Sequence, residues 1–379
     1  MALSPMKVFT SKLCITMHTP KYEFLSGAED QYYESPKRLE AILEYLQSQP
    51  DSFELTERFE DFGYEPIKRV HKPDFLDYLE TAYEEWIQEG GHENGVLPAT
   101  IPHYKVARLG KMKAKNILSK AGEYCFDLSA VITKDTFQAA WNSAQITLTA
   151  TKELVQVASE YEKNLEAGTV TRENPPGLYA LVRPPGHHAQ SDLCGGYCFM
   201  NNVAIATQWV LDQPDLKRKD GSAKKIAILD IDFHHGNGTQ EVFYTVSNPL
   251  YTSLHSQDDY PYFSGAAEEK GEGEGLGFNI NIPLPHATTN DDYVETLERL
   301  IQEHVLPFEA DYIIVSLGVD TFKDDPIAGF LITTEGYPRI GNAIRKIGLP
   351  TLFVQEGGYC IEKLGVNVGG ILKGFLGQA

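Results

Sequence analysis

Four side chains that can bind a metal ion lie within six residues of one another: Asp230, Asp232, His234 and His235. They follow the apolar run 226–229, which is typical of a strand buried on both faces. Because alternate residues of an extended segment point to the same side, Asp232 and His234 share a face. A carboxylate and an imidazole placed in this way form half of a divalent metal site. A solvated loop after a core strand is the alternative interpretation of this segment taken alone.

The elements that must position these residues alternate between strand and helix in the second half of the chain. Apolar runs that end in polar or glycine-rich clusters predict strands at 178–182, 226–230, 250–254, 278–282, 312–317 and 351–354, with helices at 202–211 and 336–347. This alternation predicts an α/β fold, with a parallel sheet covered by helices on both faces. Ligands bind beyond the carboxyl ends of such strands, so the polar clusters are expected to form one site.

The first half of the chain is expected to add further elements to the same domain. The pattern predicts a strand at 7–15, an irregular segment at 18–33, a helix after Ser35 and Pro36, helices at 71–88 and 135–159, and loops at 90–102 and 162–176. No repeat or linker divides the chain, so we expect a single domain over residues 1–379. Met6 is an alternative start, which would make residues 1–5 an extension.

Composition restricts the classes of partner. The chain has 53 acidic and 33 basic residues and a formal net charge of −20. A surface this acidic repels nucleic acid and attracts cations, although acidic composition also serves solubility alone. No apolar run approaches the ~18 residues of a membrane span, and the N-terminus lacks a secretory pattern. The five cysteines contain no CxxC pair, so we expect free thiols in a cytoplasmic protein that binds neither nucleic acid nor membrane.

Six polar motifs occur in a fixed order along the chain. They are RPPGHHA (183–189), GGYCFMNN (195–202), LDIDFHHGNGTQ (229–240), SLH (253–255), SLGVDTFKDDP (316–326) and EGGY (356–359). Together they resemble the zinc-dependent histone deacetylase superfamily, and more closely the bacterial acetylpolyamine amidohydrolases. The resemblance covers nearly the whole chain. It implies an arginase/deacetylase-like fold and the hydrolysis of an N-acetyl amide on a primary amine carried by a linear chain.

The resemblance implies that Asp232, His234 and Asp320 bind one catalytic Zn²⁺ ion. Two carboxylates and one imidazole leave positions open for water and for a substrate oxygen, as a catalytic zinc site requires. Fe²⁺ or Co²⁺ can occupy such a site as well. For Asp320 alone, a helix N-cap is the alternative. The family's structural K⁺ ion would bind Asp230 and backbone carbonyls near Asp232, His234 and Leu254, although the residues themselves do not suggest that ion.

His187 and His188 match the family's histidine pair. The resemblance implies that His188 is the general base and that His187 is the acid or electrostatic partner. Asp230 would orient His187, and Asn237 would lie behind His188. Because a carboxylate raises the basicity of an imidazole whereas an amide only fixes its tautomer, we expect His187 to have the higher proton affinity. A histidine-rich turn that merely packs is the alternative.

Three aromatic residues complete the implied site. Tyr359 follows two glycines that let the backbone pass close to the metal, and its hydroxyl would donate to the oxyanion of the reaction. Tyr197 and Phe263 match the pair of rings that lines the family's substrate tunnel, and Gly196 belongs to the same substrate-binding set. Core aromatic residues would give the same pattern in sequence.

An acidic loop, residues 18–35, is expected near the entrance of the site. Glu23 aligns with the acid that recognises the distal ammonium group in acetylpolyamine amidohydrolases, and Glu29, Asp30 and Glu34 add negative charge. Carboxylates attract a cationic tail, although salt screens the attraction. The expected substrate is therefore a small cationic acetylated amine, and the family's use of this region in dimers implies a homodimer. A plain solvated loop is the alternative.

Two positions depart from the family pattern, and three alternative functions stay open. Leu118 or Ser119 replaces an acid that bacterial relatives supply from a partner subunit, and Ile327 replaces the gatekeeping glutamate of eukaryotic polyamine deacetylases. Polyamine recognition would then be weaker or different. The alternatives are a deacylase acting on acetyl-lysine or longer acyl groups, an arginase-like binuclear hydrolase, and an inactive sensor of acetylated amines.

Overall fold

The computed structural model describes residues 5–25, 27–103, 105 and 114–378. Within these residues, eight strands form one sheet in the order β4-β1-β5-β10-β9-β6-β7-β8, and every neighbouring pair in it is parallel. The strands are β1 Met6–Phe9, β4 Phe53–Thr56, β5 Gly177–Ala180, β6 Ile226–Asp230, β7 Leu250–Ser256, β8 Asn279–Leu284, β9 Tyr312–Leu317 and β10 Thr351–Gln355.

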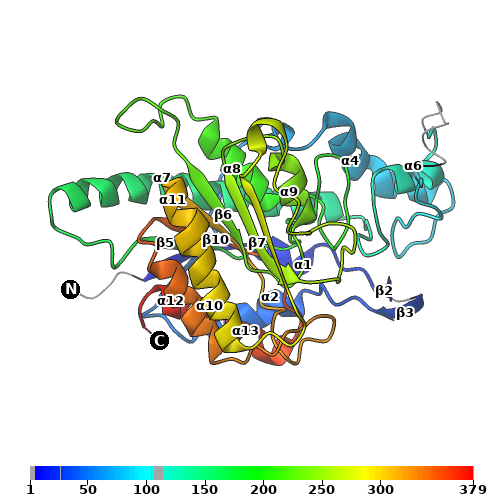
Figure 1. The fold of residues 1–379 in the computed structure, drawn as a ribbon. Coiled ribbons are helices and arrows are strands. Elements are labelled where there is room, and N and C mark those ends of the chain that lie inside the picture. The colour runs from blue at the N-terminus through cyan, green and yellow to red at the C-terminus, as the bar shows by residue number, and fades with distance from the viewer. Residues whose placement is uncertain (1–4, 26, 104, 106–113, 379) are drawn as a thin grey trace.

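Helices cover both faces of this sheet (Figure 1). On one face α2, α10, α12 and α13 pack together, and on the other α3, α4 and α8 pack with the long helix α7. The helices are α1 Leu13–Thr16, α2 Lys37–Gln47, α3 Glu65–Lys68, α4 Pro73–Gln88, α6 Ile117–Glu123, α7 Thr136–Glu166, α8 Asn202–Leu211, α9 Asn237–Phe243, α10 Asn290–Leu300, α11 Leu306–Phe308, α12 Gly336–Arg345 and α13 Ile361–Phe375, with the shorter turns η1 Gly273–Gly275 and η2 Ile301–Val305.

The two-sided cover explains the apolar strands. Every residue of β6, β9 and β10 is buried, as expected for parallel strands between two helical layers. β6 and β9 are neighbours with Asp230 opposite Ser316, so the segments that follow them leave the sheet at the same edge. This register brings residues that are nearly ninety positions apart in sequence to one place.

A separate two-stranded hairpin, β2 Tyr22–Leu25 and β3 Ala28–Gln31, lies apart from the main sheet (Figure 1). It is antiparallel and mostly exposed, with only Glu23 buried. The expectation of an irregular segment at 18–33 is therefore wrong in part. Each strand of the hairpin has only four residues, which is too short for an alternating pattern to reveal it.

The α/β class and the helices on both faces are confirmed. The expected strand at 7–15 is too long, since β1 ends at Phe9 and the helical turn α1 follows. Helix α7 continues to Glu166, into the segment predicted as a loop, because Glu, Lys and Leu in residues 160–166 favour a helix and Tyr161 is buried there. Residues 1–4 of the suggested extension lie outside the described residues. None of the helices in the described ranges combines the length and apolar character that crossing a membrane requires.

Candidate metal centre and active site

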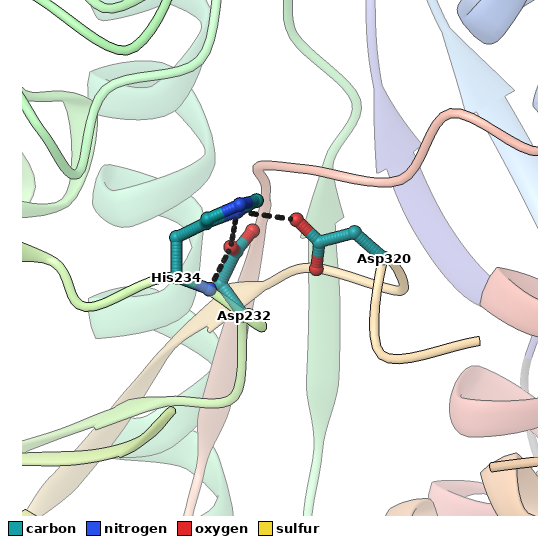
Figure 2. Close-up of side chains that lie close together, drawn as sticks. All are labelled: Asp232, His234 and Asp320. Carbon is teal, nitrogen blue, oxygen red and sulfur yellow. Dashed lines mark hydrogen bonds and ion pairs between the residues drawn. The ribbon is translucent and has the colours of Figure 1, made fainter. Parts of the chain in front are cut away.

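Asp232, His234 and Asp320 meet at the shared edge of β6 and β9 (Figure 2). His234 Nδ1 lies 3.1 Å from Asp320 Oδ2 and 3.4 Å from Asp232 Oδ1, and one ligand atom from each residue lies within 4.8 Å of the others. Asp232 and His234 share a face of the segment after β6, as their spacing predicts, and Asp320 comes from the loop after β9. The structure therefore brings the three predicted metal ligands together.

The charges of this cluster fit a divalent cation. Both carboxylates are fully buried. Burial raises the pKa of Asp232, but the charge of His187 and bonds from His234 outweigh it and hold that pKa well below its usual range. Burial and the charge of Asp232 raise the pKa of Asp320. Two buried carboxylates this close repel each other unless a cation lies between them, and a metal ion held by two oxygens and one nitrogen supplies that charge.

The histidine pair lies beside the cluster, with the ring centroids 4.0 Å apart. His187 Nδ1 donates to Asp230 Oδ2 at 3.2 Å, and His188 Nδ1 donates to Asn237 Oδ1 at 2.7 Å. Because Nδ1 of His188 carries a proton, its Nε2 carries the lone pair that a general base needs. The two partners are those that the sequence predicts.

The two imidazoles differ in proton affinity. Burial lowers the pKa of His187, but the charges of Asp232 and Asp230 outweigh it and raise that pKa to about 10. Burial and the charge of the neighbouring His187 lower the pKa of His188 well below its usual value. This order agrees in direction with the expected one. His188 is therefore suited to accept a proton, and His187 to remain a cation.

Glu356 fixes the loop that carries the histidine pair. Its buried carboxylate accepts the backbone N–H groups of Gly186 at 2.7 Å and His187 at 3.1 Å. Burial raises the pKa of Glu356 to about 7, against the opposing charge of His187. The sequence analysis assigned no role to this residue, although it begins the EGGY motif.

The same loop brings Tyr359 to the site past Gly357. A Cβ at Gly357 would lie 2.3 Å from Asp320 Oδ2 and 2.6 Å from Asp232 Oδ2, so only glycine lets the backbone pass the metal ligands. The Tyr359 ring is buried, with the Arg38 guanidinium 4.8 Å from its centroid. None of the described residues hydrogen-bonds to its hydroxyl, which can therefore donate to a bound substrate.

A cavity of about 390 Å³ joins these groups. It is lined by side chains of the site, by aromatic residues and by the hairpin, namely His188, His234, Tyr359, Gly196, Tyr197, Tyr260, Tyr262, Ile327, Asp127, Leu128, Ser129, Asp259, Phe24, Leu25 and Gly27. The aromatic rings in this lining suit a linear alkyl chain.

Phe263 does not take the place predicted for it. Its side chain is 97% exposed and does not line the cavity, whereas Tyr260 and Tyr262 do. A tight turn, with Tyr262 at φ +65° and Phe263 N–H donating to the Pro261 carbonyl, points Phe263 into solvent. The sequence analysis missed Tyr260, whose ring lies 5.0 Å from that of His188. The only signal was the Tyr-Pro-Tyr sequence after the SLH motif.

Gly196 and Tyr197 both line the cavity, as predicted. Gly196 has φ +55°, and a Cβ there would lie 2.2 Å from His188 Cδ2. Its N–H donates to Asp127 Oδ2 at 3.0 Å, a contact that the sequence analysis did not anticipate. Tyr197 donates its hydroxyl to Glu23 Oε1 at 3.1 Å.

Glu23 and Glu34 do not present their charges at the entrance as expected. Glu23 is fully buried and does not line the cavity, and burial raises its pKa to about 7. Glu34 is also fully buried, with Oε1 2.7 Å from Arg38 Nη1 and 3.0 Å from Arg183 Nε. It pairs with two buried arginines, which is a structural role. Of the acids named for this loop, only Glu29 and Asp30 on β3 keep contact with solvent.

Comparisons with known proteins agree with this geometry. Residues 32–375 match the histone deacetylase domain family. Acetylpolyamine amidohydrolase 1 of Pseudomonas aeruginosa is 38% identical over 365 residues, covering 96% of this chain and 97% of that protein. The acetylpolyamine amidohydrolase of Mycoplana ramosa is 35% identical over 363 residues, covering 95% and 97%.

A solved structure extends the likeness to three dimensions. The crystal structure of an acetylpolyamine aminohydrolase from Burkholderia pseudomallei superposes with a TM-score of 0.84 at 32% identity, covering 98% of this chain and 99% of that one. The range matched to the domain family contains all three metal-binding candidates and both histidines of the pair. The chain therefore belongs to the histone deacetylase family.

Proposed function

We propose that this protein is a zinc-dependent amidohydrolase that removes acetyl groups from N-acetylated amines, with acetylpolyamines as its substrate class. One observation carries the proposal: His234, which belongs to the buried cluster with Asp232 and Asp320, lines the same cavity as His188 and Tyr359. The names of relatives that match over nearly the whole chain support the substrate class. Zn²⁺ suits two carboxylates and an imidazole, and Fe²⁺ or Co²⁺ would suit them as well.

The chain's own residues account for the proton transfers. The bound ion would supply a polarised carbonyl and an acidified water. Neutral His188 accepts a proton from the attacking water through its free Nε2. His187 stays positively charged beside Asp230 and stabilises the negative charge that develops. The hydroxyl of Tyr359 donates to the oxyanion, and a histidine then protonates the departing amine, so that acetate and a free amine leave.

Charge and shape support a linear cationic substrate. The cavity is bordered by tyrosine rings that fit a thin alkyl chain. The net charge of −20 favours the approach of a cation, and Glu29 and Asp30 lie on the hairpin next to the cavity-lining residues Phe24 and Leu25.

Further parts of the proposal rest on the family resemblance and on composition. They are a homodimer formed through the hairpin region and a structural K⁺ ion near Asp230. The free cysteines support a reducing, cytoplasmic location, and the acidic charge supports the expectation that no nucleic acid is bound. A single domain over the chain is proposed on the same grounds as in the sequence analysis.

A substrate panel tests the proposal. N-acetylputrescine, N-acetylspermidine, an acetyl-lysine peptide and a butyrylated amine are compared by release of the acid, with added Zn²⁺ and after chelation. We expect kcat/KM for the acetylpolyamines to exceed that for the peptide by about tenfold or more, the size of one good polar contact. Chelation should abolish turnover, and Zn²⁺ should restore it.

Each other result points to a different function. A preference for the peptide or the longer acyl group would favour a general deacylase. Two metal ions per chain in the active protein would favour an arginase-like hydrolase. Binding of acetylated amines without release of acid, with Zn²⁺ present, would show a sensor.

A further inference from the structure

Asp325 is a buried carboxylate to which the mechanism above gives no role. It follows β9, five residues after Asp320, and is 8% exposed. It does not line the cavity. Among the described residues, each bond to its carboxylate comes from the backbone, from the N–H groups of Tyr359, Cys360 and Ile327. A buried carboxylate that accepts only backbone groups fixes the path of the chain.

Two of these bonds anchor the residue that carries the proposed oxyanion donor. Asp325 Oδ2 accepts from Tyr359 N–H at 2.7 Å and from Cys360 N–H at 3.2 Å. Here the chain changes from the EGGY loop to helix α13, with Gly358 at φ +118° and no side-chain cap at Cys360. A negative charge is favoured near the N-terminus of a helix, so the carboxylate stabilises this junction. Holding the Tyr359 backbone restricts where its phenol can lie.

The third bond reaches another residue of the cavity. Asp325 Oδ1 accepts from Ile327 N–H at 3.3 Å and closes the turn that contains Pro326. Ile327 and Tyr359 line the same cavity. One carboxylate thus ties together a residue of the substrate channel and the residue expected to donate to the oxyanion.

We propose that Asp325 is a positioning residue that holds the Tyr359 hydroxyl at the oxyanion by fixing the backbone of Tyr359 and Ile327. The inference rests on the proposed amide hydrolysis and deepens it. Asp325 acts through Tyr359 and does not touch the substrate. The alternative is a carboxylate that stabilises the fold without any specific effect on Tyr359.

A double-mutant cycle separates the two possibilities. Asp325→Ala removes both carboxylate oxygens, so the N–H groups of Tyr359, Cys360 and Ile327 lose their acceptor. We expect Asp325→Ala to lower kcat by about tenfold and to change KM by less than about threefold. In a Tyr359→Phe background the same substitution should lower kcat by less than about twofold, because the group that it positions is already gone.

A second measurement does not depend on activity. Amide hydrogen exchange at Tyr359 and Cys360 should become faster by about tenfold or more in Asp325→Ala, since both amides lose the oxygen that they share. The neighbouring Asp324→Ala is the matched control, because that side chain is 62% exposed and pairs with Lys323. It should change neither kcat nor exchange. If Asp325→Ala does not fold, Asp325→Ser replaces it in both experiments.

Either of two results would overturn the inference. One is an equal loss of kcat from Asp325→Ala with Tyr359 and with Phe at position 359, which would show a general structural effect. The other is unchanged exchange at the two amides, which would show that the carboxylate does not hold them. If the unmodified enzyme released no acetate, the proposed function would fail, and the exchange measurement would still decide whether Asp325 fixes this junction.

Discussion

The hydroxyl of Tyr359 has no hydrogen-bond partner among the described residues, although its ring is buried against Arg38 and Tyr197. A buried ring with an unengaged hydroxyl that lines the cavity is what an oxyanion donor requires before substrate binds. Gly357 makes this placement possible, because any larger residue would collide with Asp320.

We predict that Tyr359→Phe loses about 10²-fold or more in kcat, the cost of one oxyanion donor, with the metal retained. The ring and its packing on Arg38 are unchanged by the substitution, so the loss measures the hydroxyl alone. Steady-state kinetics with a metal analysis of the same sample checks both parts. An unchanged kcat would show that the Tyr359 hydroxyl does not stabilise the oxyanion. If the variant lost its metal, the fall in kcat would reflect damage to the metal site instead.

Strands and polar motifs could be predicted because they repeat simple patterns. β6, β9 and β10 are continuous apolar runs, and their carboxyl ends meet in the sheet as the parallel arrangement requires. The hairpin β2–β3 could not be predicted, since its two strands have only four residues each and are mostly exposed. Identifying the hairpin requires knowledge of the contacts that it makes with the rest of the chain.

The directions of individual side chains could not be predicted from the sequence, for a different reason. Tyr262 and Phe263 are adjacent aromatic residues, and a positive φ at Tyr262 decides which of them faces the cavity. Glu23 and Glu34 look like solvent-exposed acids in sequence, because acidic residues are seldom buried unless they are paired. Tyr197 and Arg183, which pair with them, come from distant segments, whereas Arg38 follows Glu34 by four residues. The positions of the metal ligands could be predicted, because these residues follow the ends of neighbouring parallel strands.

The position of Glu23 on the hairpin gives a prediction that differs from the role that the family resemblance implies for this residue. Glu23 is expected from the family to bind the distal ammonium group, but here it lies outside the cavity and accepts from Tyr197. Glutamine can accept the same bond. We therefore predict that Glu23→Gln changes kcat/KM for N-acetylspermidine by less than about threefold.

The control for Glu23→Gln is a pair of substrates. N-acetylspermidine carries the distal charges, and a neutral N-acetylalkylamine of similar length does not. A loss of about tenfold or more that is confined to the charged substrate would show that Glu23 reaches the ammonium group during turnover, and the placement of Glu23 behind Tyr197 would then be wrong for the substrate complex.

The net charge of −20 acts on the encounter with substrate rather than on the fold. Raising the salt concentration from 0.1 M to 1 M shortens the screening length from about 10 Å to about 3 Å. We predict that kcat/KM for a cationic acetylpolyamine falls by about threefold or more over this range, while kcat/KM for the neutral N-acetylalkylamine changes by less than about twofold. Equal salt effects on both substrates would show that charge does not guide binding.

His71 links folding stability to pH. It lies before α4 and is 1% exposed, with Nδ1 donating to the Gln190 carbonyl at 3.0 Å and Nε2 accepting from Asn201 N–H at 2.8 Å. It therefore joins the N-terminal half to the segment that carries Tyr197. A protonated ring would lose its acceptor, and burial lowers the pKa of His71 from 6.5 to about 4.

This shift fixes the direction of the pH effect. Between pH 6.5 and 4 the unfolded chain binds a proton that folded His71 does not, so its contribution is present above pH 6.5 and lost as pH falls through 4. The full contribution is about 3 kcal/mol. His71→Gln can keep both bonds without titrating, so the free energy of unfolding in urea should fall less between pH 7.5 and 4.5 for the variant. Comparing the two proteins cancels the other buried histidines and any bound metal. Equal falls would mean that His71 does not couple stability to pH.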